Sequence, residues 1–382
     1  MTTQTLVRRV AGLTLLLAPA FAGAQDDKLT IHGSANLAYG KSDKLPIDGV
    51  TQDGTSEYLV IALQFGYKVS EKDRVVTQLV HRKVGSSPLN AVTPDILPVW
   101  AFYEHRFDNG TSVKAGRSPL PRGLFNEVRY VGTLLPTFRV GSAVYGETLE
   151  YMDGIVVRKP FGLGGDWKLD ASAFVGGYSL KVQLPTATGI RTLDLRNENS
   201  FGTQVFLNTP IEGVRVGAFY NNYMSTPSAS VPDAERPKRT TATMYSAEAV
   251  FSKVFARSEV NVFRQPKDPN FVDYTSYYVQ GGITPTDKIT LVTEYSAGTN
   301  VVRFAGTPLP DLDLPLNNDL TIGVVYKPNP QVAFKLEGHQ VEGYSFDRPV
   351  PSIIPPTAPP LVARLAPKSS TYFALASVAF TF

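Results

Sequence analysis

Four arginines in one stretch of the chain are the residues with the clearest chemical potential. Arg117, Arg122, Arg129 and Arg139 lie close together in sequence, and between the first and the last of them Glu127 is the only acid. A guanidinium stays charged at any working pH and binds carboxylate or phosphate through a planar fork of N–H groups. The stretch therefore indicates an anion-attracting site, although Glu127 and Arg129 could instead pair and hold a loop.

Other charged residues occur one at a time, in segments whose apolar and polar residues alternate as they do in β-strands. A charge on the inner face of a wide barrel stays in water, whereas on a lipid-facing wall it costs about 2–4 kcal/mol at mid-membrane. Five of these residues are predicted to line a pore, and the plainer interpretation of each is a solvated strand face. They are Lys114, Lys168, Arg215, Glu294 and Glu337.

No other pattern in the sequence indicates catalysis, a metal or a cofactor. The four histidines stand alone on different predicted strands, without the paired spacing of metal ligands. There is no cysteine, and no Gly-x-Ser-x-Gly elbow is present. The glycine-rich stretch 162–165 precedes a predicted strand rather than a helix, so it does not match a phosphate-binding loop. A serine hydrolase assembled across several strands remains an open alternative.

The scaffold that must position these residues is a series of short strands. Stretches of about ten residues alternate apolar and polar side chains and are separated by turn-forming residues, as in membrane barrels. We count sixteen, and an even number lets both termini lie at one end. The predicted strands are 29–40, 59–69, 74–84, 97–107, 111–117, 153–160, 167–178, 200–208, 213–224, 242–252, 254–265, 271–283, 288–298, 318–327, 331–341 and 371–382.

Both ends of the chain point to export and to a membrane barrel. In the last strand Tyr372, Val378, Phe380 and Phe382 fall on one face at period two. That pattern resembles the terminal strand by which the barrel-assembly machinery recognises outer-membrane proteins, so Phe380 and Phe382 are predicted to be an assembly signal. An ordinary C-terminal edge strand is the alternative.

The first residues read as a signal peptide. A short basic region, Arg8 and Arg9, precedes an apolar core at 10–21 that is too short to span a bilayer. Small residues follow at 22–24, so we expect cleavage after Ala24. Residues 1–24 are then the leader and residues 25–382 a single barrel domain.

Composition agrees with a barrel and excludes other classes. Hydrophobic residues make up 43% and the mean hydropathy is −0.08, which is too polar for a helical membrane protein. The 18 tyrosines and 21 phenylalanines suffice for aromatic girdles at the two surfaces of a lipid bilayer. The formal charge of +3 gives no reason to expect a nucleic acid as partner.

Two runs of residues resemble a known family. The run from Gly116 to Pro136, Gly-Arg-x-x-x-Pro-x-Gly-Leu-Phe-Asn-Glu-x-Arg-x-Val-Gly-Thr-x-Leu-Pro, is similar to one found in many little-characterised proteobacterial porins. The later run from Lys335 to His339 resembles a strand of the same group. The resemblance implies an all-β, transmembrane, antiparallel up-and-down barrel in which the third long loop, residues 118–147, folds inward as a constriction. It also implies a homotrimer in the outer membrane.

The function that follows is passive diffusion of small hydrophilic solutes and ions. On this interpretation Arg117, Arg122, Glu127, Arg129 and Arg139 form the constriction, and they should give a mild preference for anions. A substrate-selective channel for an anion or an aromatic acid is the alternative within transport. A barrel enzyme and a structural barrel are the alternatives from other classes.

Overall fold

A computed structural model describes most of the chain. The described residues are 28–87, 90, 95–146, 149–186, 189–227, 238–264, 272–302, 312–343, 346–347 and 369–382. The predicted signal peptide, residues 1–24, and its cleavage site after Ala24 lie outside them. Within the described ranges no helix is both long and apolar enough to cross a membrane.

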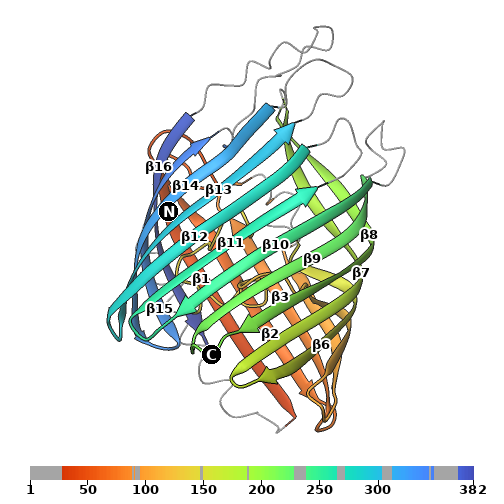
Figure 1. Ribbon diagram of the computed structural model, residues 1–382. Helices are drawn as coiled ribbons and strands as arrows, with labels where there is room; N and C mark the ends of the chain where they lie inside the picture. Colours follow the sequence, from red (N-terminus) through yellow and green to blue (C-terminus); the bar gives the residue numbers. More distant parts are fainter. Residues whose placement is uncertain are drawn as a thin grey trace.

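The chain forms a closed barrel of sixteen strands in which each strand is antiparallel to its neighbours (Figure 1). The first and last strands pair to close the barrel. The predicted fold class and strand number are therefore confirmed. The strands are β1 Leu29–Ser42, β2 Thr55–Lys68, β3 Asp73–Val84, β4 Leu97–Arg106, β5 Ser112–Pro119, β6 Tyr151–Gly164, β7 Trp167–Thr186, β8 Gly189–Asn208, β9 Val214–Pro227, β10 Lys238–Val250, β11 Val254–Arg264, β12 Val272–Thr286, β13 Ile289–Val302, β14 Leu312–Asn329, β15 Val332–Gly343 and β16 Ser369–Thr381.

Side chains alternate between the lumen and the outer face along each strand, as the period of a β-strand requires. In β16, Phe373 and Leu375 are buried inside, whereas Tyr372 is 52% exposed on the outer face. The apolar face predicted from the C-terminal residues is thus the outer one.

The two ends of the barrel differ in their connections. At the turn end the strands are joined by a few residues, for example 165–166 and 287–288, and at the loop end by longer segments such as 43–54 (Figure 1). The hairpin of β7 and β8 is longer than the predicted 167–178 and 200–208. Alternation of apolar and polar residues simply continues through this region, so the backbone ladder continues with it.

The third long connection runs from residue 120 to residue 150, a shift of a few residues from the predicted 118–147. We call it the inner loop, because its backbone is hydrogen-bonded to lumen-facing side chains on the far wall of the barrel. It begins after Pro119, at the end of the short strand β5.

The C-terminal residue takes part in closing the barrel. The N–H of Phe382 donates to the carbonyl of Gly33 at 3.0 Å, and the N–H of Gly33 donates to the carbonyl of Phe382 at 3.1 Å. The aromatic ring lies directly over Gly33, since a Cβ on Gly33 would be 2.2 Å from it. Phe382 therefore completes the β1–β16 seam with its backbone and covers that seam with its ring.

Deleting Phe382 should lower the yield of folded barrel. The deletion removes two backbone hydrogen bonds, worth about 1 kcal/mol each, together with an aromatic cover that remains 56% exposed to the surroundings of the barrel. Heat-modifiable mobility in SDS gels measures the folded fraction. The conservative Phe382→Tyr variant should fold normally, and a normal yield after the deletion would contradict this role.

Candidate functional site

The inner loop crosses the lumen from one wall to the opposite wall. Near its start, the N–H of Leu124 donates to Glu259 on β11 at 2.9 Å. A few residues later, the carbonyl of Tyr130 accepts a hydrogen bond of 2.7 Å from Ser34 on β1. Since β1 and β11 lie on different sides of the barrel, this part of the loop divides the lumen in two.

The loop then returns along the wall from β16 towards β11, held by a row of glutamates. Three acids on alternate strands each accept a backbone N–H from the loop, which satisfies donors that a lumen-spanning loop would otherwise leave unpaired. The pairs are Glu259 on β11 with Leu124 at 2.9 Å, Glu294 on β13 with Gly141 at 2.8 Å, and Glu337 on β15 with Phe138 at 2.7 Å.

Glu259 holds the loop at two separate places. Its side chain is fully buried and accepts the hydroxyls of Tyr145, from the loop, and of Tyr278 and Ser246, from the wall. The Tyr145 hydroxyl in turn accepts the N–H of Phe125 at 3.1 Å. One carboxylate therefore ties both the outgoing and the returning part of the loop to β11.

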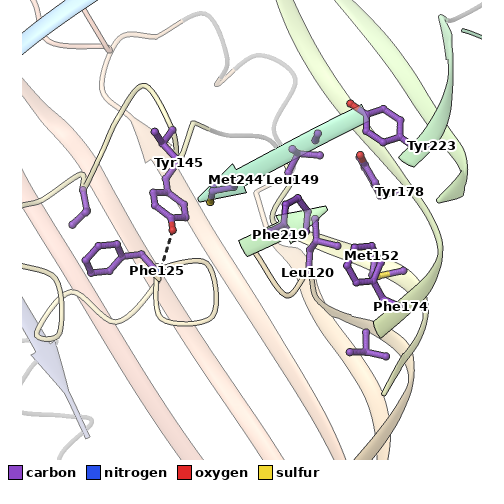
Figure 2. Close-up of a cluster of buried hydrophobic side chains, with 14 of the residues drawn as sticks. Leu120, Phe125, Tyr145, Leu149, Met152, Phe174, Tyr178, Phe219, Tyr223 and Met244 are labelled. Atoms are coloured by element: carbon purple, nitrogen blue, oxygen red, sulfur yellow. Dashed lines mark hydrogen bonds between the residues drawn. The ribbon is translucent and has the colours of Figure 1, made fainter. Parts of the chain in front are cut away.

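Apolar packing reinforces these hydrogen bonds on the β6–β10 side of the lumen. Leu120 and Leu149 of the loop are buried with Met152 of β6, Phe174 of β7 and Phe219 of β9 (Figure 2). Burying a side chain of this size contributes about 1.5–3 kcal/mol. This packing gives the loop a rigid base on that side of the lumen.

On the other side of the lumen, three cavities follow one another along β2 and β3, and β1 joins the lining of the second and third. The order of the cavities along the barrel follows from the β2 residues that line them. Strand β2 contributes Tyr58 and Val60 to the first cavity, Ala62 and Gln64 to the second, and Gln64 again to the third. We call them the upper, middle and lower cavities, counted from the loop end. Their volumes are about 70, 300 and 270 Å³.

The upper cavity has the smallest volume of the three, and arginines line it. Arg82 comes from β3, whereas Arg129 and Arg139 come from the inner loop. Arg139 donates to the hydroxyl of Tyr58 at 3.1 Å and lies 3.4 Å from the carboxylate of Asp48. Cationic side chains from the wall and from the loop thus line the same cavity.

Glu150 organises two of these arginines. Its carboxylate accepts Arg82 at 2.7 Å and lies 3.2 Å from Arg129, and it also accepts the hydroxyl of Tyr130. Burial acts to raise the pKa of Glu150, but the guanidinium groups of Arg129 and Arg82 and the Tyr130 hydroxyl together hold that pKa below its ordinary value. Glu150 therefore stays ionised and fixes the two arginines in place.

The middle and lower cavities lie further towards the turn end. The middle cavity has a mixed lining that includes His32, Gln78, Tyr130 and Leu134. The lower cavity is rich in cationic side chains, and acids accompany most of them in ion pairs. Its cationic residues are Lys28, Lys68, Lys72, Arg74 and Arg106.

Arg117 does not reach the constriction. It pairs across the sheet with Asp153, and these two residues share a face with the exposed Ile155 and Val157, so both lie on the outer wall. There Arg117 makes a bidentate contact with Asp153 at 2.7 and 2.8 Å and stacks on Tyr151. The prediction for Arg117 is wrong because the strand β5 continues through this residue before the loop begins.

Arg122 and Glu127 also do not line the upper cavity. Arg122 is buried inside the loop, donates to the carbonyl of Val144 at 2.7 Å and lies over the ring of Tyr145. Burial lowers the pKa of its guanidinium. Glu127 lines a separate cavity of about 210 Å³ on the β6–β9 side, 3.8 Å from Arg158. Of the predicted constriction residues, Arg129 and Arg139 are the two that meet.

The residues predicted to line the pore divide into three groups. Lys114, over the ring of Phe102, and Arg215, paired with Glu248 at 2.8 Å, face the lumen. Lys168 lies near the turn end and is exposed. The other two, Glu294 and Glu337, are buried as anchors of the inner loop.

Arg82 and Glu150 were missed by the sequence analysis. Strand alternation places Arg82 on the same face as Val80, which is buried, and this was the available signal. Nothing in the sequence placed Glu150 opposite Arg82, since the path of the loop brings them together. Among the described residues, no three potential metal ligands gather into one group.

Comparison with known proteins connects this geometry to outer-membrane barrels. No protein-family model and no curated protein matches the sequence. Among solved structures, OmpF of Salmonella typhi in complex with daunomycin is 13% identical, with a TM-score of 0.59 over 93% of this chain and 97% of that one. The anion-selective porin of Comamonas acidovorans is 10% identical, with a TM-score of 0.54 over 93% and 99%.

OmpT, an outer membrane protein of Vibrio cholerae, is 13% identical, with a TM-score of 0.54 over 94% of this chain and 99% of that one. At these identities the likeness concerns the fold alone. The chain has the barrel architecture of outer-membrane porins over nearly its whole length.

Proposed function

We propose that this protein is an outer-membrane channel through which small hydrophilic solutes and ions diffuse passively, with a preference for anions. The observation that carries the proposal is the row of three cavities along β2 and β3, of which the smallest is lined by Arg82, Arg129 and Arg139. In this role the barrel catalyses no reaction.

Selection would occur in the upper cavity. Low-dielectric walls concentrate the field of a charge, so a few guanidinium groups at a narrow point outweigh the nearly neutral average of the chain. Glu150 offsets part of this charge and Asp48 offsets part of that of Arg139. The resulting preference for anions should be real but moderate, as expected for a diffusion channel.

Export and assembly follow from the same proposal. The leader would be removed after Ala24, the outer face would contact lipid, and the barrel-assembly machinery would recognise Phe380 and Phe382. Intact-mass measurement of the mature protein should give a chain beginning at Gln25. A chain that retained residues 1–24 in the membrane would contradict the export step.

We also propose a homotrimer, and the outer face of β5 and β6 supports it. The ion pair of Arg117 with Asp153 would face lipid in a single barrel, at a cost of about 2–4 kcal/mol for a charge near mid-membrane. Contact with a second copy would remove that cost. Native mass spectrometry in detergent should detect three chains, and the variant Arg117→Ala with Asp153→Ala should weaken the trimer if this face is the contact.

The arginines of the upper cavity should control ion selectivity. Replacing Arg139 by glutamine removes one charge from the constriction, worth about 1 kcal/mol at 4 Å in water, or roughly fivefold in local chloride concentration. The reversal potential in a KCl gradient should move towards potassium. Arg117→Gln is the matched control on the outer wall and should leave the potential unchanged. A shifted potential in Arg117→Gln together with an unchanged potential in Arg139→Gln would mean that residues outside the upper cavity select the ions.

A further inference from the structure

The upper cavity combines charged side chains with an apolar wall. Between its arginines lie Tyr58 and Phe138, whose rings stack with centroids 4.7 Å apart, together with aliphatic side chains such as Leu135 and Val140. None of the described residues that line it is acidic. Such a cavity offers guanidinium groups to the anionic group of a solute. It also offers aromatic and aliphatic side chains to the apolar part of the same solute.

The middle cavity also has an apolar part to its lining. Leu134 projects into it with 59% of its surface exposed, beside Val131 and Ala62. A leucine this exposed within a lumen leaves apolar surface in water, which is unfavourable unless a solute covers it. Leu134 and Leu135 are consecutive and line the middle and upper cavities respectively, and Tyr130 lines both. The two cavities are therefore adjacent, with the charged side chains in the upper one.

We propose that the upper and middle cavities together form a binding site for small organic monocarboxylates with an apolar body, of which benzoate is the simplest aromatic example. The inference rests on the proposed channel function and names the solute class of that site. The carboxylate contacts Arg139 and its neighbours in the upper cavity, and the apolar body lies in the middle cavity against Leu134.

Two physical terms favour such a solute over inorganic anions. A guanidinium is more weakly hydrated than an ammonium and matches a carboxylate with a planar fork, so the pair forms with little loss of hydration. The apolar body gains about 25 cal/mol for each Å² that it removes from water. Chloride gains only the first kind of attraction and must give up its own water in a cavity with an apolar wall. Acetate has the carboxylate but almost no body.

The test is solute block of the chloride current through the purified, full-length protein in planar bilayers. Potassium benzoate and potassium acetate are added separately to symmetric KCl, and the half-blocking concentration of each is measured. Benzoate should block at a lower concentration than acetate. In Leu134→Ser the ratio of the two concentrations should shrink roughly tenfold, the effect of losing one leucine-sized apolar contact. In Arg139→Gln both solutes should block less well.

Ile211→Ser is the matched control, because this exposed residue lies in the turn between β8 and β9, outside the cavities. It should keep the wild-type ratio. Equal half-blocking concentrations for benzoate and acetate in a conducting wild-type channel would overturn this inference and leave the channel function standing. An unchanged ratio in Leu134→Ser would also overturn it. The absence of any current would instead contradict the channel function itself.

Discussion

Replacing Glu259 by leucine is expected to release the inner loop and to raise single-channel conductance. The carboxylate accepts the N–H of Leu124, and the hydroxyls of Tyr145, Tyr278 and Ser246. Leucine fills a similar space but leaves each of these buried donors unsatisfied, at about 1–3 kcal/mol for each. Since loop docking depends on a few such contacts, the loop should leave the wall for a substantial part of the time.

Larger and noisier unit currents in planar bilayers would report this release. Faster hydrogen exchange at the amides of Leu124 and Phe125 would report it independently, because the Leu124 amide loses its acceptor and Tyr145, the acceptor of the Phe125 amide, loses the carboxylate that holds it. Glu104→Leu is the matched control. Glu104 is also a buried lumen-facing glutamate, but it pairs with Arg74 and Arg106 on the wall. Equal changes in the two variants would mean that Glu259 has no special hold on the loop.

Replacing Glu150 by glutamine is expected to strengthen the preference for anions and to weaken the attachment of the inner loop to the barrel wall. The substitution keeps the shape of the side chain but leaves Arg82 and Arg129 without their shared anion. Removing one partner of a buried ion pair typically costs about 3–5 kcal/mol. The same loss of negative charge raises the positive potential of the upper cavity. Selectivity and stability should thus move in opposite directions, which a purely structural role for Glu150 would not produce.

Reversal potentials and the thermal stability of the folded barrel measure the two effects of Glu150→Gln. Asp153→Asn is the control, because Asp153 is an acid three residues further along that faces the outer wall. It should leave the reversal potential unchanged. A shift of Glu150→Gln towards potassium would contradict the assignment of Arg82 and Arg129 to the filter.

The barrel could be predicted from the sequence because its periodicity is local. Alternation at period two identifies each strand without knowledge of its neighbours, as β16 illustrates with Tyr372 outside and Phe373 inside. Strand ends were less certain. The hairpin of β7 and β8 extends well beyond its predicted limits, because nothing in its alternation marks the point where a loop should begin.

The site was harder to predict because it depends on the path of one loop. Arg117 and Arg122 belong to the same sequence cluster as Arg129, yet one lies on the outer wall and the other is buried within the loop. Arg82 is distant in sequence from these arginines. It joins them only because the end of the inner loop brings Glu150 back to β3, where it pairs with Arg82. Glu294 and Glu337 have the right parity for the pore, but they satisfy loop amides there.

The most direct test of the channel and its arginine filter is the reversal potential of the wild-type protein in a planar bilayer under a KCl gradient. Arg82, Arg129 and Arg139 in the upper cavity should give a conducting channel whose potential lies on the chloride side of zero. A conducting channel with its potential on the potassium side would contradict the filter, and a folded barrel without conductance would contradict the channel.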